Sequence, residues 1–171
     1  MKIITIFGDE NVGKTTLVWD VFNKLMETGA ELTYFHVFGA DGRDFHAIVV
    51  WEGKIIAICS IGDVAYEEDI KDSGISEDEK SFLYVKNGID MARKYKAEIL
   101  LNVVSNSIKE KCPDIKEKYE ELLKDDNQKN EVLSTVLFER KSTDLIEVAI
   151  KKRQECRNAI IKDLRNFSVG G

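Results

Sequence analysis

The amino-acid sequence predicts an α/β fold of three layers, in which a mostly parallel sheet with one β-hairpin carries helices on both faces. Two observations lead to this class. Apolar runs with strand character alternate along the chain with segments whose apolar residues recur every three or four positions. The apolar runs 47–51 and 55–61 are joined by a short glycine-containing turn, which indicates a hairpin. Such alternation is typical of parallel sheets that are covered on both faces.

The first elements follow one another closely. A strand is expected over 3–7, followed by a glycine-rich loop and a helix from about Thr16, which Gly29 can end. A second strand is expected over 32–38, and the polar segment 39–44 reads as a turn before the hairpin.

The second half continues the alternation. Ser76 and Glu79 fit the capping-box pattern, so a helix is expected from there to about Tyr95. Further elements are expected in the order strand, helix, strand and helix, at 98–104, from Pro113 to Leu123, at 132–138 and at 144–166.

Composition and charge limit the class of protein. The chain has 171 residues and is most simply one domain, 1–171. A net charge of −6 argues against general nucleic-acid binding. There is no apolar run long enough for a membrane span, and the chain begins directly with a strand, so no signal peptide and a cytoplasmic location are expected. Three widely spaced cysteines are expected to be reduced thiols.

The stretch from Gly8 to Thr15 has the spacing G-x-x-x-x-G-K-[ST] directly after the strand 3–7. The glycines allow the backbone to curl so that successive N–H groups point at a polyphosphate. Lys14 can reach the β- and γ-phosphate oxygens, and the Thr15 hydroxyl can ligate Mg²⁺. The helix that follows adds the positive end of its dipole. The stretch therefore predicts a site for a nucleoside triphosphate.

Through this motif the chain resembles the P-loop NTPase superfamily, over residues 2 to about 28. The resemblance implies Mg²⁺ as cofactor and a P-loop NTPase fold. The residues expected to contact the nucleotide are Gly8, Asp9, Glu10, Asn11, Val12, Gly13, Lys14, Thr15 and Thr16.

A P-loop enzyme also needs an acid at the end of a neighbouring strand, to hold Mg²⁺ or its water shell. Asp63 is the candidate, so Thr15 and Asp63 are the expected metal ligands. Gly62 separates Asp63 from the apolar run, however, and Ser60 stands where the acid usually stands. Asp41 is the alternative metal partner.

The turn after the second strand carries Asp41, Arg43 and Asp44. A polar loop at a strand end can supply a mobile catalytic acid or an arginine that neutralises phosphate charge, or it can simply be solvated. The catalytic residues expected from the sequence are Lys14, Asp63 and Arg43.

The base and the reaction are less closely defined. Small Ras-like GTPases read guanine with N-K-x-D and use D-x-x-G at the γ-phosphate, and both patterns are missing here, which favours ATP over GTP. Three functions stay open: an ATPase that acts as a nucleotide-dependent switch or motor on an unknown protein partner, a kinase that transfers the γ-phosphate to a small-molecule or nucleotide acceptor, and a nucleotide-binding module without turnover. A homo-oligomer is possible.

Overall fold

The structure is a computed structural model that describes residues 1–9, 12–39, 41–62, 71, 74–105, 117, 121, 124, 131–137 and 145–167. The elements in chain order are β1 (Lys2–Gly8), α1 (Lys14–Glu27), β2 (Glu31–Phe38), β3 (Asp44–Trp51), β4 (Lys54–Cys59), α3 (Glu77–Lys94), β5 (Ile99–Ser105), β6 (Glu131–Leu137) and α6 (Ile146–Asn166). These elements confirm the strands and helices expected at these positions, with ends that differ by a few residues. The helix expected from Pro113 falls largely outside the described residues.

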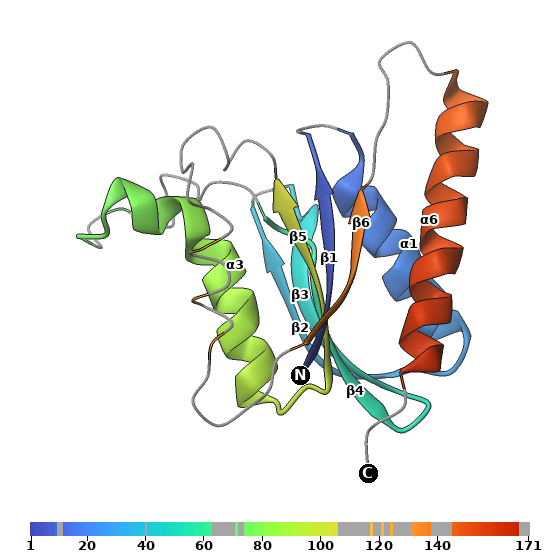
Figure 1. Ribbon diagram of the computed structural model, residues 1–171, viewed down its shortest axis with the longest axis horizontal. Helices are drawn as coiled ribbons and strands as arrows, with labels where there is room; N and C mark the ends of the chain where they lie inside the picture. The colour runs from blue at the N-terminus through green and yellow to red at the C-terminus, as the bar shows by residue number, and fades with distance from the viewer. Residues whose placement is uncertain are drawn as a thin grey trace.

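One six-stranded sheet, in the order β2-β3-β4-β5-β1-β6, forms the centre of the molecule (Figure 1). Strands β4, β5, β1 and β6 run parallel to one another. Strand β3 runs antiparallel to both of its neighbours, β2 and β4. The carboxyl ends of β4, β5 and β1 therefore meet the amino end of β3 at one edge of the sheet.

The predicted fold class, a three-layer P-loop NTPase fold with a mostly parallel sheet and one hairpin, is wrong. The sheet is mixed, because β2, β3 and β4 form an antiparallel meander with two antiparallel pairings. The segments that join these strands, 39–43 and 52–53, are too short for the crossover of a dozen or more residues that a parallel pair requires. Strand β2 lies at the open edge, with most of its side chains exposed.

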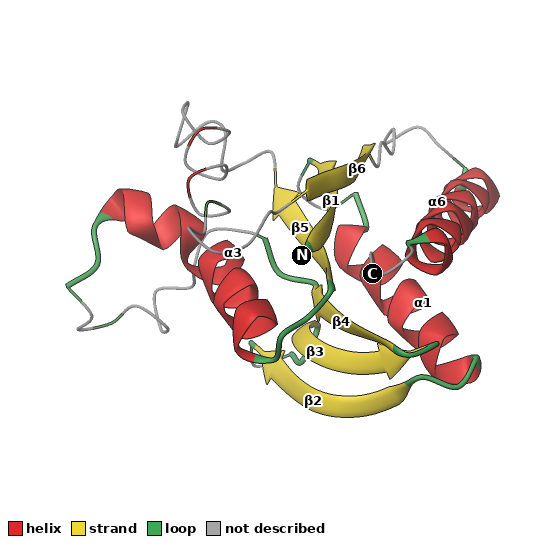
Figure 2. Ribbon diagram, turned by 60° about the horizontal axis from the view of Figure 1, so that its bottom comes forward, coloured by secondary structure: helices red, strands yellow, loops and turns green. Residues whose placement is uncertain are grey.

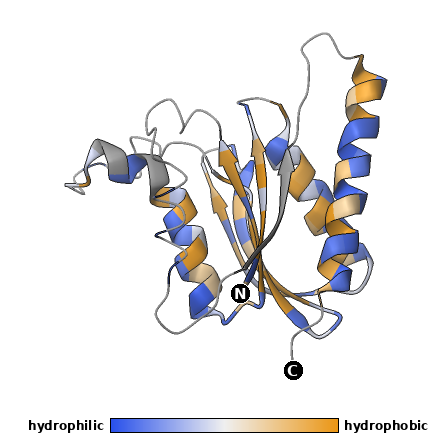
Figure 3. Ribbon diagram, viewed as in Figure 1, coloured by the Kyte–Doolittle hydropathy of each residue, from blue (hydrophilic) through white to orange (hydrophobic). Residues whose placement is uncertain are grey.

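Helices cover both faces of this sheet (Figure 2). Helices α1 and α6 share one face, where Leu17, Val21 and Ile160 join a core cluster with inward-facing strand residues. Helix α3 covers the other face through Val85 and Ile89. Figure 3 shows apolar residues concentrated in the central strands, whereas the helices carry apolar and polar residues in turn. Within the described part of the chain, no helix has both the length and the apolar character that a membrane crossing requires.

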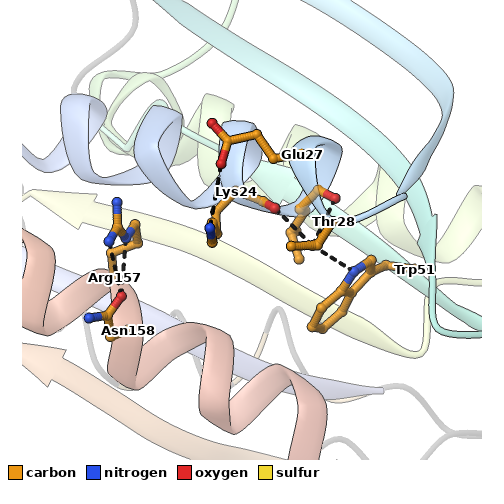
Figure 4. A network of polar contacts seen from close by, with 7 residues as sticks. Lys24, Glu27, Thr28, Trp51, Arg157 and Asn158 are labelled. Carbon is orange, nitrogen blue, oxygen red and sulfur yellow. Dashed lines mark hydrogen bonds and ion pairs between the residues drawn. The ribbon is translucent and has the colours of Figure 1, made fainter.

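The β3–β4 hairpin is anchored at its turn, far from the carboxyl ends of the parallel strands. Glu52 and Gly53 both have positive φ angles, of 48° and 77°, as a two-residue type I′ turn demands. Next to the turn, the indole of Trp51 donates a hydrogen bond of 3.1 Å to the Thr28 hydroxyl, at the end of α1 (Figure 4). Lys54 donates to the carbonyl oxygen of Leu164 in α6 at 3.1 Å. These contacts fix the hairpin against both helices of that face.

Candidate functional site

The loop between β1 and α1 lies at the sheet edge where the parallel strands end, which is where α/β sheets generally bind ligands. Helix α1 begins at Lys14, and Gly13 precedes it in the left-handed conformation, with φ of 94°. Glycine at this cap position has no side chain to satisfy the first N–H groups of the helix. These groups and the positive end of the helix dipole are therefore suited to bind an anion.

Lys14, the first residue of α1, is buried and only 7% exposed. Its ammonium donates a hydrogen bond of 3.0 Å to the carbonyl oxygen of Gly8 and another to the carbonyl oxygen of Asp9. Both carbonyls belong to the segment where the chain leaves β1. The positive charge is thereby placed beside the end of β1, next to the helix N-terminus.

A carboxylate from β3 approaches the first turn of α1. The Thr15 hydroxyl donates a hydrogen bond of 3.1 Å to Oδ1 of Asp44, the first residue of β3. The hydroxyl of Ser60, just beyond the end of β4, donates to the same oxygen at 3.3 Å. Ser60 also accepts a bond of 2.8 Å from the N–H of Phe45. Asp44 thus links the helix to the strand pair β3–β4.

A second contact ties α1 to the turn before β3. Trp19 lies one helical turn after Thr15, and its indole N–H donates to the carbonyl oxygen of Arg43 at 2.7 Å. The Arg43 side chain itself is 80% exposed and forms an ion pair of 3.1 Å with Asp41. The backbone of this turn is therefore held against α1 while the two charged side chains face solvent.

The residues predicted for the site are placed as follows. Gly8, Asp9, Gly13, Lys14 and Thr15 surround the start of α1, Val12 is buried in the core, and Thr16 is exposed. Glu10, Asn11 and Asp63 lie outside the described residues, so the predicted role of Asp63 at the metal stays a prediction.

Sequence reasoning grouped Asp44 with Asp41 and Arg43 but missed its contact with Thr15. The sequence pattern that indicates this contact is an acid at the first position of a strand, here Asp44 in β3, that pairs antiparallel with the next strand along the chain, here β4. Such a strand brings its amino end to the edge where the parallel strands have their carboxyl ends. The Asp44–Thr15 contact spans 29 positions of sequence and follows only from the pairing of β3 with β4.

Gly62 explains why no acid directly follows the apolar run 55–61. A Cβ atom at this position would lie 2.0 Å from the carbonyl oxygen of Val103 in β5. The Gly62 carbonyl accepts a hydrogen bond of 3.1 Å from the N–H of Ser105, so the chain here runs against the end of β5. A residue with a side chain has no room at Gly62, and the Ser60 hydroxyl already bonds to the N–H of Phe45 and to Asp44.

Two buried titratable groups of the sheet, His46 in β3 and Cys59 in β4, pair with each other across the strands and do not contact the loop between β1 and α1 in any bond described above. His46 pairs across the strands with His36 and Cys59 and is 3% exposed, and its Nε2 has no hydrogen-bond partner among the residues that the structure describes. Burial, together with the nearby His36, lowers the pKa of His46 to about 4. Burial likewise raises the pKa of the Cys59 thiol. Both groups are therefore neutral at pH 7.

Comparison of the chain with models of known protein families, with curated proteins and with solved structures found no match. A function for the chain must therefore be inferred from its own residues and their arrangement.

Proposed function

We propose that the chain binds a Mg²⁺–nucleoside triphosphate, preferentially ATP, at the loop between β1 and α1 and hydrolyses it as a nucleotide-dependent switch. One observation carries the proposal. Within the stretch that resembles the P-loop motif, Lys14 is buried at the uncapped start of α1, beside the end of β1. A fixed ammonium and a helix N-terminus at one point suit the charge of a polyphosphate.

The residues of the loop have separate roles in this proposal. The backbone N–H groups around Gly13 hold the phosphate oxygens, and Lys14 neutralises charge between the β- and γ-phosphates. The residues also fit Mg²⁺, because the Thr15 hydroxyl is an oxygen donor of the kind that this cation prefers, and the Asp44 carboxylate, 3.1 Å away, adds negative charge beside it. Thr15 would hold the ion, and Mg²⁺ would then offset the negative charge that develops during phosphoryl transfer.

The mixed sheet is compatible with this function. A phosphate-binding loop is a local unit of strand, turn and helix, and it does not depend on how the distant strand β2 is paired. The unit β1–loop–α1 is present, and β1 lies between two parallel neighbours. The proposal therefore rests on the loop and not on the fold class.

Binding is tested by titrating the chain with ATP, GTP, CTP and UTP, each with Mg²⁺ and with excess EDTA. ATP with Mg²⁺ is expected to bind most tightly. Lys14→Ala is expected to weaken binding at least about tenfold, since it removes a charge-assisted contact. Lys24→Ala is the matched control, because Lys24 lies on the same helix but is exposed and paired with Glu27. Equal affinity of the Lys14→Ala and wild-type chains contradicts the proposal.

Turnover separates the three functions that the sequence leaves open. Phosphate release from ATP alone, abolished in Lys14→Ala, supports the switch ATPase. Release of ADP only after a nucleoside or nucleotide is added supports a kinase. Binding without either reaction supports a module that does not turn over. We place the protein in the cytoplasm in this proposal, with an unidentified protein as the partner of the switch.

A further inference from the structure

We propose that Asp44 is the positioning residue of the metal site, in that its carboxylate orients the Thr15 hydroxyl for Mg²⁺. The inference rests on the proposed function and deepens it. The sequence led us to expect the acid of the metal site at Asp63, beyond the carboxyl end of a parallel strand. Asp44 lies instead at the amino end of the antiparallel strand β3.

The first argument is the direction of the hydroxyl proton. A threonine hydroxyl has one proton to donate and two lone pairs to offer. In the structure the Thr15 proton points to Oδ1 of Asp44 across 3.1 Å. With its proton held there, the hydroxyl presents its lone pairs to other directions, where a cation can accept them. A carboxylate that orients a metal ligand in this way also raises the electron density on the ligand.

The second argument is the rigidity of the carboxylate. Asp44 is the first residue of β3, and the next residue, Phe45, is fully buried. The Ser60 hydroxyl donates to the same Oδ1, and Ser60 and Phe45 exchange two further hydrogen bonds, of 2.8 and 3.0 Å. The acid is therefore attached to the sheet and not to a free loop, as precise positioning of a ligand requires.

The third argument is the contrast with the other acid of the same turn. Asp41 lies three residues earlier, is 56% exposed and forms an ion pair with Arg43. Its carboxylate therefore faces solvent and a neighbouring cation, whereas that of Asp44 faces α1. Replacing either aspartate by asparagine removes one negative charge, but only at Asp44 is that charge beside Thr15. Asp41 is therefore a matched control.

The test measures how much Mg²⁺ improves the binding of the β,γ-imido analogue of ATP, by isothermal titration with Mg²⁺ and with EDTA. In Asp44→Asn this improvement is expected to fall about tenfold or more, the usual cost of losing an outer partner of a metal ligand. Affinity in EDTA is expected to stay at the wild-type value. Asp41→Asn is expected to keep the full Mg²⁺ effect. Urea unfolding checks that each variant folds, and Asp44→Ser replaces Asp44→Asn if the latter does not.

Other outcomes overturn the inference in distinguishable ways. If the wild-type chain fails to bind the analogue under either condition, the proposed function fails and the inference with it. If the wild-type chain binds but Asp44→Asn keeps the full Mg²⁺ effect, only the inference fails. Equal losses in Mg²⁺ and in EDTA also overturn it, because they indicate a purely structural role.

A double substitution shows whether Asp44 acts through Thr15. Thr15→Val removes the hydroxyl, so adding Asp44→Asn to it is expected to cause no further loss of the Mg²⁺ effect. A further loss of the same size as in the single variant indicates that Asp44 reaches the metal independently, which contradicts the positioning role.

Discussion

His46 makes the stability of the fold depend on pH in a direction that the structure defines. Burial and His36 lower the pKa of His46 from 6.5 to about 4. The unfolded chain therefore takes up the proton more readily than the folded chain between these two values. The sign follows: stability is unaffected above pH 6.5 and is lost as the pH falls toward 4. The difference in pKa corresponds to a loss of about 2 kcal/mol at pH 5 and about 3 kcal/mol at pH 4.

The experiment is urea unfolding of the wild-type chain and of His46→Met at pH 7.5 and pH 5. Methionine fills a similar volume without a titratable group, and it removes a nitrogen that has no partner within the described part of the chain. At pH 7.5 the variant is expected to be at least as stable as the wild type. At pH 5 the wild type is expected to lose about 2 kcal/mol more than the variant.

Two features make this test specific. The titration of the carboxylates is shared by both chains, so it cancels when the loss of stability between the two pH values in His46→Met is subtracted from the loss in the wild type. His36→Gln is the control, because it removes an exposed imidazole on the neighbouring strand and leaves His46 in place. This control is expected to keep most of the loss at pH 5. Equal pH dependence in the wild type and His46→Met refutes the argument that burial of His46 is responsible.

Three further predictions concern stability. Gly62→Ala is expected to cost about 3 kcal/mol or more in urea unfolding, because its Cβ would overlap the backbone of β5. Gly29→Ala meets no atom within 4 Å, so its cost is limited to the strain of an alanine at a φ of 94° and is expected to be smaller. Ser76→Ala removes the capping box of α3 and is expected to lower stability by about 1 kcal/mol in thermal unfolding, whereas Ser76→Thr is expected to retain most of it. A double-mutant cycle on Arg153 and Asp20, 2.6 Å apart between α6 and α1, is expected to give a coupling of about 1 kcal/mol, and a value near zero contradicts a stabilising role for the pair.

Local patterns in the sequence predicted the individual elements well. The capping box at Ser76 and Glu79 and the hairpin turn at Glu52 and Gly53 depend on residues a few positions apart, and both are confirmed. The pairing of β2 could not be predicted in the same way. Its apolar run is compatible with a buried parallel strand or with an edge strand, and only the antiparallel pairing with β3 places it at the edge.

At the candidate site, too, the sequence predicted what depends on neighbouring residues and missed what depends on strand pairing. The loop from Gly8 to Thr15 is defined by spacing within one segment, so sequence alone located it. The partner of Thr15 could not be located in that way, since Asp44 reaches it through the pairing of β3 with β4. Reasoning from parallel sheets looks for the acid after a strand and therefore selected Asp63, which lies outside the described residues.

The error in the fold class and the missed acid have one physical cause. Because β3 runs antiparallel to β4, its first residue, Asp44, lies beside the carboxyl ends of the parallel strands. Ser60, which follows β4 at the position where an acid usually stands, donates a hydrogen bond to Asp44. Side chains of a strand alternate between the two faces, so a slip of β3 by one residue would turn Phe45 out of the core on the α1 face. The same slip would shift Asp44 along the strand, out of line with Thr15 and Ser60. The apolar core on the α1 face therefore fixes the register that places the carboxylate. The contact at the candidate metal site is in this way set by the hydrophobic packing of the meander.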